Sequence, residues 1–349
     1  MAHTGVLLTA FGGPDSLDAV PAFLRSIMGV EPSDAVLQGA VRKYLTIGGA
    51  SPLPAMAERV AAQLERSLNR LPRADEPEEG PGLLGAGFAV PAGMRAVEGV
   101  KVPVAVGMLH STPTIEDAIA RLVESGVREL VWVSLSPFDA AVTVGAYETA
   151  VETAAAAHSG LRVFKAPAYR HSDPFVQFFA EGLSESLHDV DILKNKALVL
   201  FSAHSLPLAD VASDPSYVDQ LQETAAAVAA GAGLGKASGF DALDGVDAFG
   251  GPGVTSPWLL AYQSKGARGG DWLGPDLVST VDAAAEAGFA VVVVCPVGFA
   301  LDHMETLYDI DVVAADHALS AGMEFARTAV PNDSAFMIEA LTESVRRAL

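Results

Sequence analysis

Histidine and acidic residues follow two apolar runs of the chain. The run at 197–202 leads into His204, and the run at 290–296 is followed by Glu305 and Asp309. An imidazole at the end of a strand can bind a borderline metal ion or accept a proton near neutral pH. Glu305 and Asp309 are four residues apart, so a helix would place both carboxylates on one face, where a cation or proton relieves their repulsion. The sequence therefore predicts a nitrogen–oxygen site made by His204 and Glu305.

Simpler explanations exist for single residues around this site. His204 alone could be a loop histidine bonded to its own backbone. Asp302 is expected to cap the start of the helix that carries Glu305, and His303 is expected to face elsewhere and to pack or cap. Cys295 stands inside an apolar run and is predicted to be an inert buried thiol. The Gly-Gly-Pro at 12–14 predicts a tight turn, because the spacing of a dinucleotide-binding loop is absent.

Short apolar runs alternate with longer helical patterns along the chain. The runs are nearly continuous in hydrophobicity, which is typical of strands buried on both faces of a parallel sheet. The expected strands are Gly5–Phe11, Val102–Met108, Leu130–Leu135, Leu161–Ala166, Ala197–Ser202, Trp258–Gln263 and Ala290–Pro296. The expected helices are Ser51–Arg70, Ile115–Ser125, Ala146–His158, Pro174–Leu187, Pro215–Ala230, Pro275–Ala287, Asp302–Ala321 and Ser334–Leu349. This alternation predicts an α/β fold with two similar doubly wound, Rossmann-like domains, parallel sheets and a cleft between them.

We place the division near residue 167, with residues 1–167 and 325–349 in an N-terminal domain and residues 168–324 in a C-terminal domain. Two segments, 72–99 and 236–253, are rich in Gly with Pro, Asp or Ala and are predicted to be inserted surface loops.

Composition narrows the functional class. The 349 residues are 50% hydrophobic, which excludes an intrinsically disordered chain, and the net charge of −21 argues against nucleic acid or an anionic membrane surface as the main partner. The single cysteine cannot form an internal disulfide or a four-cysteine iron–sulfur cluster. We see no targeting or membrane-spanning segment and expect a cytoplasmic protein.

Six segments, in their order along the chain, resemble ferrochelatase, the family that inserts ferrous iron into porphyrins. The most specific are Ser-Ala-His-Ser-Leu-Pro at 202–207 and Val-Gly-Phe-Ala-Leu-Asp-His-Met-Glu-Thr-Leu-Tyr-Asp-Ile-Asp at 297–311. The others are segments 11–15, 47–53, 262–264 and 271–276. The resemblance implies that His204 and Glu305 are the catalytic and metal-binding residues, with Asp309 behind them as a proton relay. Which of His204 and Glu305 accepts the protons stays open.

The resemblance also implies residues that bind the substrate. Ser51, Lys43 and Tyr147 match positions that hold propionates, and Phe11, Tyr262 and Trp272 match positions that line the cleft. His110 after Gly-Met-Leu is closer to the branch that uses coproporphyrin III, so we expect that substrate first and protoporphyrin IX next.

The chain departs from the family pattern at three positions. Lys43 replaces an arginine, so the charge is kept while bidentate pairing is lost. Phe11 replaces a tyrosine that can touch the metal. Val313 replaces a carboxylate, which weakens the case for a peripheral magnesium site.

The resemblance implies Fe²⁺ as a substrate, haem as the product, no tightly bound cofactor and a monomer. Three alternatives remain open at this point. The chain could be a chelatase for another ring or metal, such as cobalt and sirohydrochlorin. It could be a non-catalytic tetrapyrrole-binding protein. More remotely, it could be a sugar- or nucleotide-binding α/β enzyme, which the absence of a phosphate loop disfavours.

Overall fold

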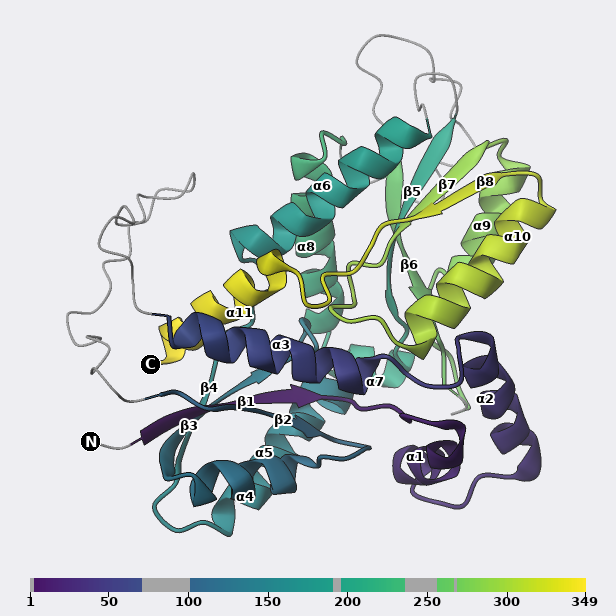
Figure 1. Cartoon of the computed structure of the whole chain (residues 1–349). Coiled ribbons are helices and arrows are strands. Elements are labelled where there is room, and N and C mark those ends of the chain that lie inside the picture. Colours follow the sequence, from purple (N-terminus) through teal and green to yellow (C-terminus); the bar gives the residue numbers. More distant parts are fainter. Residues whose placement is uncertain (1–2, 71–100, 191–195, 236–255, 267–268) are drawn as a thin grey trace.

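Two four-stranded parallel sheets organise the chain (Figure 1). The computed structural model describes residues 3–70, 101–190, 196–235, 256–266 and 269–349. The first sheet has the order β2-β1-β3-β4, with β1 at His3–Ala10, β2 at Val104–Met108, β3 at Val127–Ser134 and β4 at Arg162–Lys165. The second has the order β6-β5-β7-β8, with β5 at Ala197–His204, β6 at Trp258–Gln263, β7 at Val291–Cys295 and β8 at Glu324–Arg327.

The two sheets share one topology, because each begins in its interior, adds a strand on one side and then continues on the other. This order is that of a doubly wound sheet and confirms the predicted fold class. The four valines at 291–294 are all fully buried, as are residues 198–201 of the neighbouring strand. Strands covered on both faces have no need of polar alternation, which explains the continuous apolar runs in the sequence.

Helices cover the sheets, and several begin at the side chains expected of helix caps. Ser33 and Ser334 accept hydrogen bonds from the backbone two or three residues into their helices, and Thr114 forms a reciprocal capping box with Asp117. The α-helices are α1 Val20–Met28, α2 Asp34–Thr46, α3 Leu53–Leu68, α4 Ile115–Glu124, α5 Ala146–Ala156, α6 Asp173–Asp189, α7 Leu208–Ser213, α8 Ser216–Gly231, α9 Leu277–Glu286, α10 Ala315–Ser320 and α11 Ala335–Ala348. A 3₁₀ turn at Leu17–Ala19 and π-helical segments η2 (Ala141–Gly145) and η4 (Glu305–Ala314) complete the list.

The structure corrects several predicted elements. Helices α1, α2 and α7 and strand β8 were not expected. The segment 302–321 is not one α-helix, because it begins as the π-helix η4 and becomes α-helical only at α10. Strand β5 continues through His204, two residues beyond its predicted end. The predicted loops 72–99 and 236–253 lie outside the described residues.

The last helix joins the two halves of the chain. Helix α11 packs against α3 and β3 of the first half and against α6, and Figure 1 shows α3 and α11 running along the boundary between the sheets. The division at residue 167 stays a prediction. Residues 325–327, expected in the N-terminal domain, belong to β8 and pair with β7 of the second sheet.

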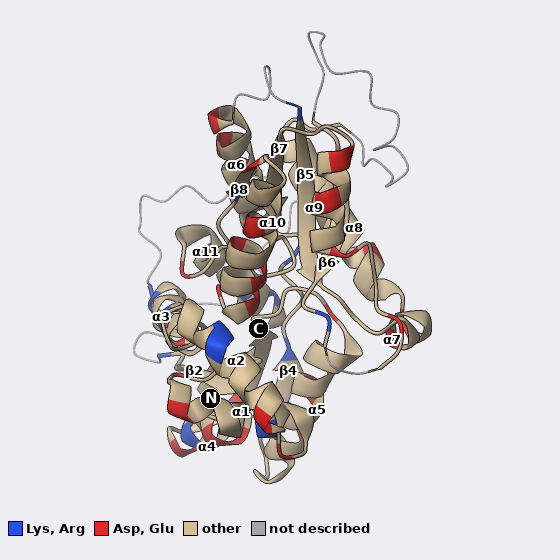
Figure 2. Ribbon diagram, turned by 90° about the vertical axis from the view of Figure 1, so that its right-hand side faces the viewer, with Lys and Arg blue, Asp and Glu red and all other residues tan. Residues whose placement is uncertain are grey.

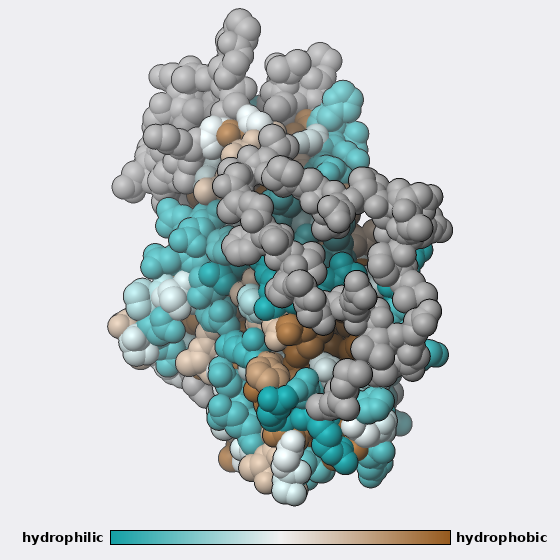
Figure 3. All heavy atoms as spheres, turned by 90° about the vertical axis from the view of Figure 1, so that its left-hand side faces the viewer, coloured by the Kyte–Doolittle hydropathy of each residue, from teal (hydrophilic) through white to brown (hydrophobic). Residues whose placement is uncertain are grey.

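The surface reflects the acidic composition. In Figure 2, acidic segments recur along α9 and α10, whereas α2 carries a basic segment. The described surface in Figure 3 is largely hydrophilic, with a hydrophobic area in its lower half. None of the described helices is long and apolar enough to cross a membrane.

Candidate active site

The candidate site lies where the second sheet changes its winding direction. Strands β5 and β7 are neighbours in the sheet, and the chain leaves them toward opposite sides. Ligands bind to doubly wound sheets beyond the carboxyl ends of strands at such a switch point. His204 is the last residue of β5, and Glu305 begins η4 in the segment that follows β7.

Glu305 lies between two imidazoles. Its Oε1 is 3.4 Å from His204 Nε2, and its Oε2 is 3.3 Å from His303 Nε2. The expected pairing of His204 with Glu305 is thus present. The expectation that His303 faces elsewhere is wrong. It assumed a helix from residue 302, whereas the helix starts later, so helical periodicity does not set the direction of His303.

Charge is concentrated at this pair. Burial lowers the pKa of His204, but the Glu305 carboxylate outweighs burial and, with the Ser205 carbonyl and Asp309, raises that pKa to about 9. Burial acts to raise the pKa of Glu305, and the two histidines outweigh it and hold the pKa far below its ordinary range. Without a metal, the pair therefore carries a proton on His204 and a negative charge on Glu305 at neutral pH.

The neighbouring backbone fixes the orientation of His204. Its Nδ1 is 2.5 Å from the carbonyl oxygen of Ser205, which leaves Nε2 directed at Glu305. The Tyr217 hydroxyl of α8 donates to the carbonyl oxygen of His204 at 2.9 Å. Gly298, after β7, crosses so close to β5 that a Cβ there would lie 2.6 Å from the Cα of Ala203. Only glycine permits this crossing, which brings the segment of Glu305 beside His204.

Asp302 anchors the turn before Glu305, though not as the expected helix cap. Its carboxylate accepts hydrogen bonds from the Thr306 hydroxyl at 2.9 Å and from the Asn332 amide at 2.7 Å, and its backbone N–H donates to Asn332 Oδ1 at 2.8 Å. Asn332 has a left-handed backbone with φ of 49°. The helix starts after Asp302, so its carboxylate binds side chains instead of the backbone N–H groups of a first turn.

Strand β6 holds the π-helix from the other side. Gln263 donates from its amide to the carbonyl oxygen of Glu305 at 2.9 Å, and the Ser264 hydroxyl donates to Asp309 Oδ2 at 2.6 Å. The other carboxylate oxygen of Asp309 is 3.3 Å from Lys43 Nζ. Lys43 therefore lies at the predicted site, but on Asp309, the residue expected to relay protons.

Three residues expected to touch the substrate are core residues in this structure. Tyr147 is fully buried, and its hydroxyl is 3.2 Å from Ser136 Oγ. Ser51 is buried before α3, where its hydroxyl accepts from the Leu53 N–H. Tyr262 is 3% exposed, and burial raises its pKa to about 12. Their side chains present little or no surface, so a direct contact with a substrate is not available here.

The remaining expected residues are partly exposed. Phe11, after β1, and His110, after β2, form an edge-on pair with ring centres 4.6 Å apart. His110 Nδ1 is 2.9 Å from Ser26 Oγ, and burial lowers the pKa of its imidazole. Trp272 lies opposite Pro207 in an isolated β-bridge, close to the segment after His204.

Sequence reasoning missed Tyr44. It is 4% exposed on α2, and burial together with the charge of Glu305 raises the pKa of its hydroxyl. No motif marked it, because α2 itself was not expected.

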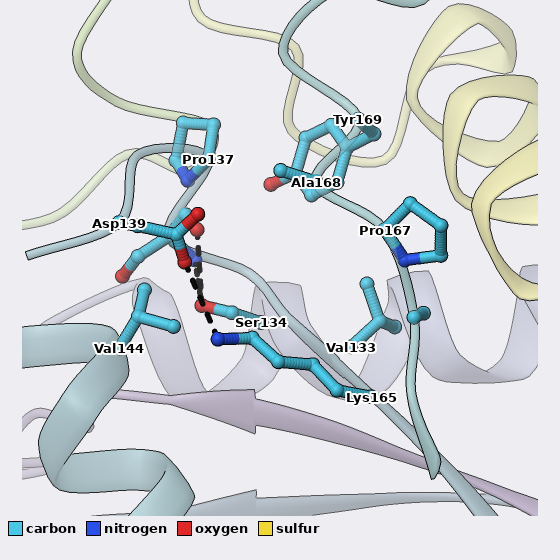
Figure 4. Close-up of a pocket in the computed structure, with 11 residues that line it drawn as sticks. Val133, Ser134, Pro137, Asp139, Val144, Lys165, Pro167, Ala168 and Tyr169 are labelled. Atoms are coloured by element: carbon cyan, nitrogen blue, oxygen red, sulfur yellow. Dashed lines mark hydrogen bonds and ion pairs between the residues drawn. The ribbon is translucent and has the colours of Figure 1, made fainter. Parts of the chain in front are cut away.

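A small pocket lies at the carboxyl ends of β3 and β4 (Figure 4). Lys165 and Asp139 face each other across it at 3.5 Å. Its volume of about 20 Å³ holds roughly one water molecule, so it cannot hold a macrocycle. The amide of Gln220 on α8 binds both the N–H and the carbonyl group of Asp139, which ties this loop to the second half.

The site can bind a borderline divalent cation through imidazole nitrogen and carboxylate oxygen, or accept protons. Within the ranges that the structure covers, no three His, Cys, Asp or Glu side chains are spaced to enclose a metal ion. A metal at the His204–Glu305 pair is therefore not caged, which suits a cation that must be passed on.

A family model identifies the chain. The model described as ferrochelatase matches residues 89–349. The chain belongs to the ferrochelatase family. Members of this family are metal-inserting chelatases, classified as lyases.

Individual relatives agree with this assignment. A ferrochelatase of Deinococcus radiodurans is 30% identical over 98% of this chain and 95% of its own length. A coproporphyrin III ferrochelatase of Halalkalibacterium halodurans is 27% identical over 99% of this chain and 97% of its own length. Among solved structures, SirB from Bacillus subtilis with Fe³⁺ matches with a TM-score of 0.50 and 12% identity, over 99% of this chain and 95% of SirB, which is a likeness of fold.

Proposed function

We propose that this protein inserts Fe²⁺ into coproporphyrin III in haem biosynthesis and releases two protons, with protoporphyrin IX as the next substrate. The observation that carries the proposal is the placement of Glu305 between two imidazoles at the switch point of the second sheet, in a chain of the ferrochelatase family. Coproporphyrin is favoured by His110 and by relatives named coproporphyrin III ferrochelatase that match nearly the whole chain.

The reaction makes two demands on the protein. Fe²⁺ must lose water, and two pyrrole N–H groups must each lose a proton. His204 Nε2 and a Glu305 oxygen can replace water on the metal, and either can take a proton once its partner has changed charge. Asp309, on the same π-helix and in contact with Ser264, is the next acceptor on the way out. Because planar rings hide their nitrogens, distortion of the ring must draw on binding of its edges, which do not react.

The proposal includes no resident cofactor and no iron–sulfur cluster, with Fe²⁺ as substrate. It also includes a monomeric state, a porphyrin substrate and haem product as the binding partners, no nucleic acid partner and a cytoplasmic location.

The test is anaerobic metal insertion followed by absorbance. Fe²⁺ is offered with coproporphyrin III or protoporphyrin IX, and Co²⁺ is offered with sirohydrochlorin. Faster turnover of coproporphyrin supports the proposal, preference for protoporphyrin overturns the choice of branch, and turnover only in the cobalt reaction establishes another chelatase. Tight binding of a finished metalloporphyrin without turnover indicates a carrier.

Two variants test the assignment of His204. We expect His204→Ala to lower metal insertion by at least about 100-fold, the usual effect of removing a general acid–base group, while porphyrin binding persists. His317→Ala is the matched control, because His317 also pairs with a carboxylate, Asp282, at 3.1 Å, but on the exposed surface of α10. Ordinary turnover by His204→Ala would remove His204 from the mechanism.

A further inference from the structure

Lys43 places a positive charge inside the acidic part of the candidate site. It extends from α2, whose neighbours are α1 and the first turn, to η4 of the second half. Its ammonium group is 3.3 Å from Asp309 Oδ1 and 5.1 Å from the ring centre of Tyr308. Figure 2 shows the basic segment of α2 next to the acidic segments below α10. The pair therefore crosses between two parts of the chain that are distant in sequence.

Asp309 is electrostatically part of the site. Its carboxylate contributes to the raised pKa of His204, so its charge reaches the imidazole that faces Glu305. The Asp309 side chain is 16% exposed, against 41% for Lys43, so the carboxylate is the less hydrated partner. Ser264 donates to one oxygen, and Lys43 binds the other. Without Lys43, the site would present a second carboxylate with no neutralising cation bound to it.

We propose that Lys43 is an internal counter-cation that neutralises Asp309 and thereby weakens the hold of the His204–Glu305 pair on a divalent metal. A carboxylate attracts a divalent cation and an ammonium group repels it, and both effects are strong where water is partly excluded. The inference rests on the proposed function, since it concerns the metal that this site passes on.

Weak holding serves a chelatase. Binding energy spent on the metal before transfer stabilises the starting state and must be given back at the transition state. A site with two free carboxylates beside an imidazole would retain the cation. With Lys43 on Asp309, the charge that attracts the metal is limited to that of Glu305.

The competing explanation is that Lys43 holds a propionate of the substrate, as the resemblance implies. The two roles differ in what they predict without a porphyrin. A propionate-binding lysine has no effect on metal affinity in the absence of the ring, whereas a counter-cation acts then as well.

The experiment is calorimetric titration of the porphyrin-free protein with Zn²⁺, a redox-inert probe, at constant pH and ionic strength. We expect Lys43→Met to lower the Kd for Zn²⁺ by about tenfold, a size suited to one partly screened charge. Lys43→Arg keeps the charge and should stay near the wild type. In the double variant Lys43→Met with Asp309→Asn, the charge balance is restored, so the affinity should return toward that of the wild type.

Lys165→Met is the matched control. Lys165 is 40% exposed and also pairs with carboxylates, those of Glu148 at 3.0 Å and Asp139 at 3.5 Å, but at the end of β4. It removes the same charge from the protein and should leave the Kd unchanged.

The outcomes separate the inference from the proposed function. If Lys43→Met and Lys165→Met give the same Kd while the wild type binds Zn²⁺, the counter-cation role is refuted and the metal site stands. His204→Ala in the same series should abolish binding. If the wild type binds no Zn²⁺, or His204→Ala binds it as well as the wild type, the metal assignment fails and the inference fails with it.

Discussion

The Glu305→Gln variant gives a direct test of the electrostatics at the candidate site. Glutamine keeps the size of the side chain and removes the charge that lies 3.4 Å from His204. In the folded wild type the pKa of His204 is about 9, against an ordinary value of 6.5. The folded state therefore holds a proton that the unfolded chain has already released between these two pH values. Stability from this proton is complete below pH 6.5 and is lost as the pH rises through about 9.

The size of this effect follows from the two pKa values. Their difference corresponds to about 3 kcal/mol at about 1.36 kcal/mol per pH unit. The His204 side chain is 35% exposed, so water screens the interaction, and we reduce the expectation to about 2 kcal/mol. Between pH 6 and pH 9.5, the free energy of unfolding of the wild type should fall by about 2 kcal/mol more than that of Glu305→Gln.

The assay is urea unfolding of metal-free protein in the presence of a chelator at both pH values. Other titrating groups are the same in both proteins and cancel in the comparison. Asp282→Asn is the control, because it removes a carboxylate from His317 at an exposed pair. Its pH dependence should match that of the wild type. An equal loss of stability in the wild type and in Glu305→Gln would refute the strong coupling of His204 to Glu305.

Two further predictions concern other parts of the structure. Asn332→Ala removes two hydrogen bonds to Asp302 and places a Cβ at a left-handed backbone position, so urea unfolding should show a loss of about 2–3 kcal/mol, of which Asn332→Gly recovers about 1. Equal losses in the two variants would exclude a contribution from backbone strain. Burial raises the pKa of Cys295 to about 12, so the native thiol should not react with a chromogenic disulfide at pH 8 and should react fully in urea. Rapid labelling of the native protein would contradict this burial.

Elements with strong periodicity could be predicted from the sequence, and weak ones could not. The valine-rich β7 and the amphipathic α3 and α4 were expected close to their observed bounds. Strand β8 is four residues long and only partly buried, so it lacks an apolar run. The short helix α7 has no buried residue, and only two residues of α1 and one of α2 are buried, which leaves little periodic signal.

The candidate site could be predicted in its two central residues. His204 and Glu305 were found because both follow buried strands at a switch point, a rule that depends on topology alone. The place of His303 depends on where the helix begins and on its π-helical winding, which a period of 3.6 residues does not reveal. Tyr147 illustrates the opposite error. Its residue type suits propionate binding, but the packing that buries it comes from segments distant in sequence.

The position of α11 has a consequence for the order in which the protein is made. This helix is the last to leave the ribosome, yet it packs against α3 and β3, which are among the first. The whole second sheet is synthesised in between, at roughly 5–20 residues per second. Throughout that interval the apolar surface that receives Met337, Leu341 and Val345, all fully buried at the end, stays uncovered. The nascent first half must therefore wait with an open core until its own C-terminus arrives, and a chain that stops short of α11 keeps that surface open to aggregation or proteolysis.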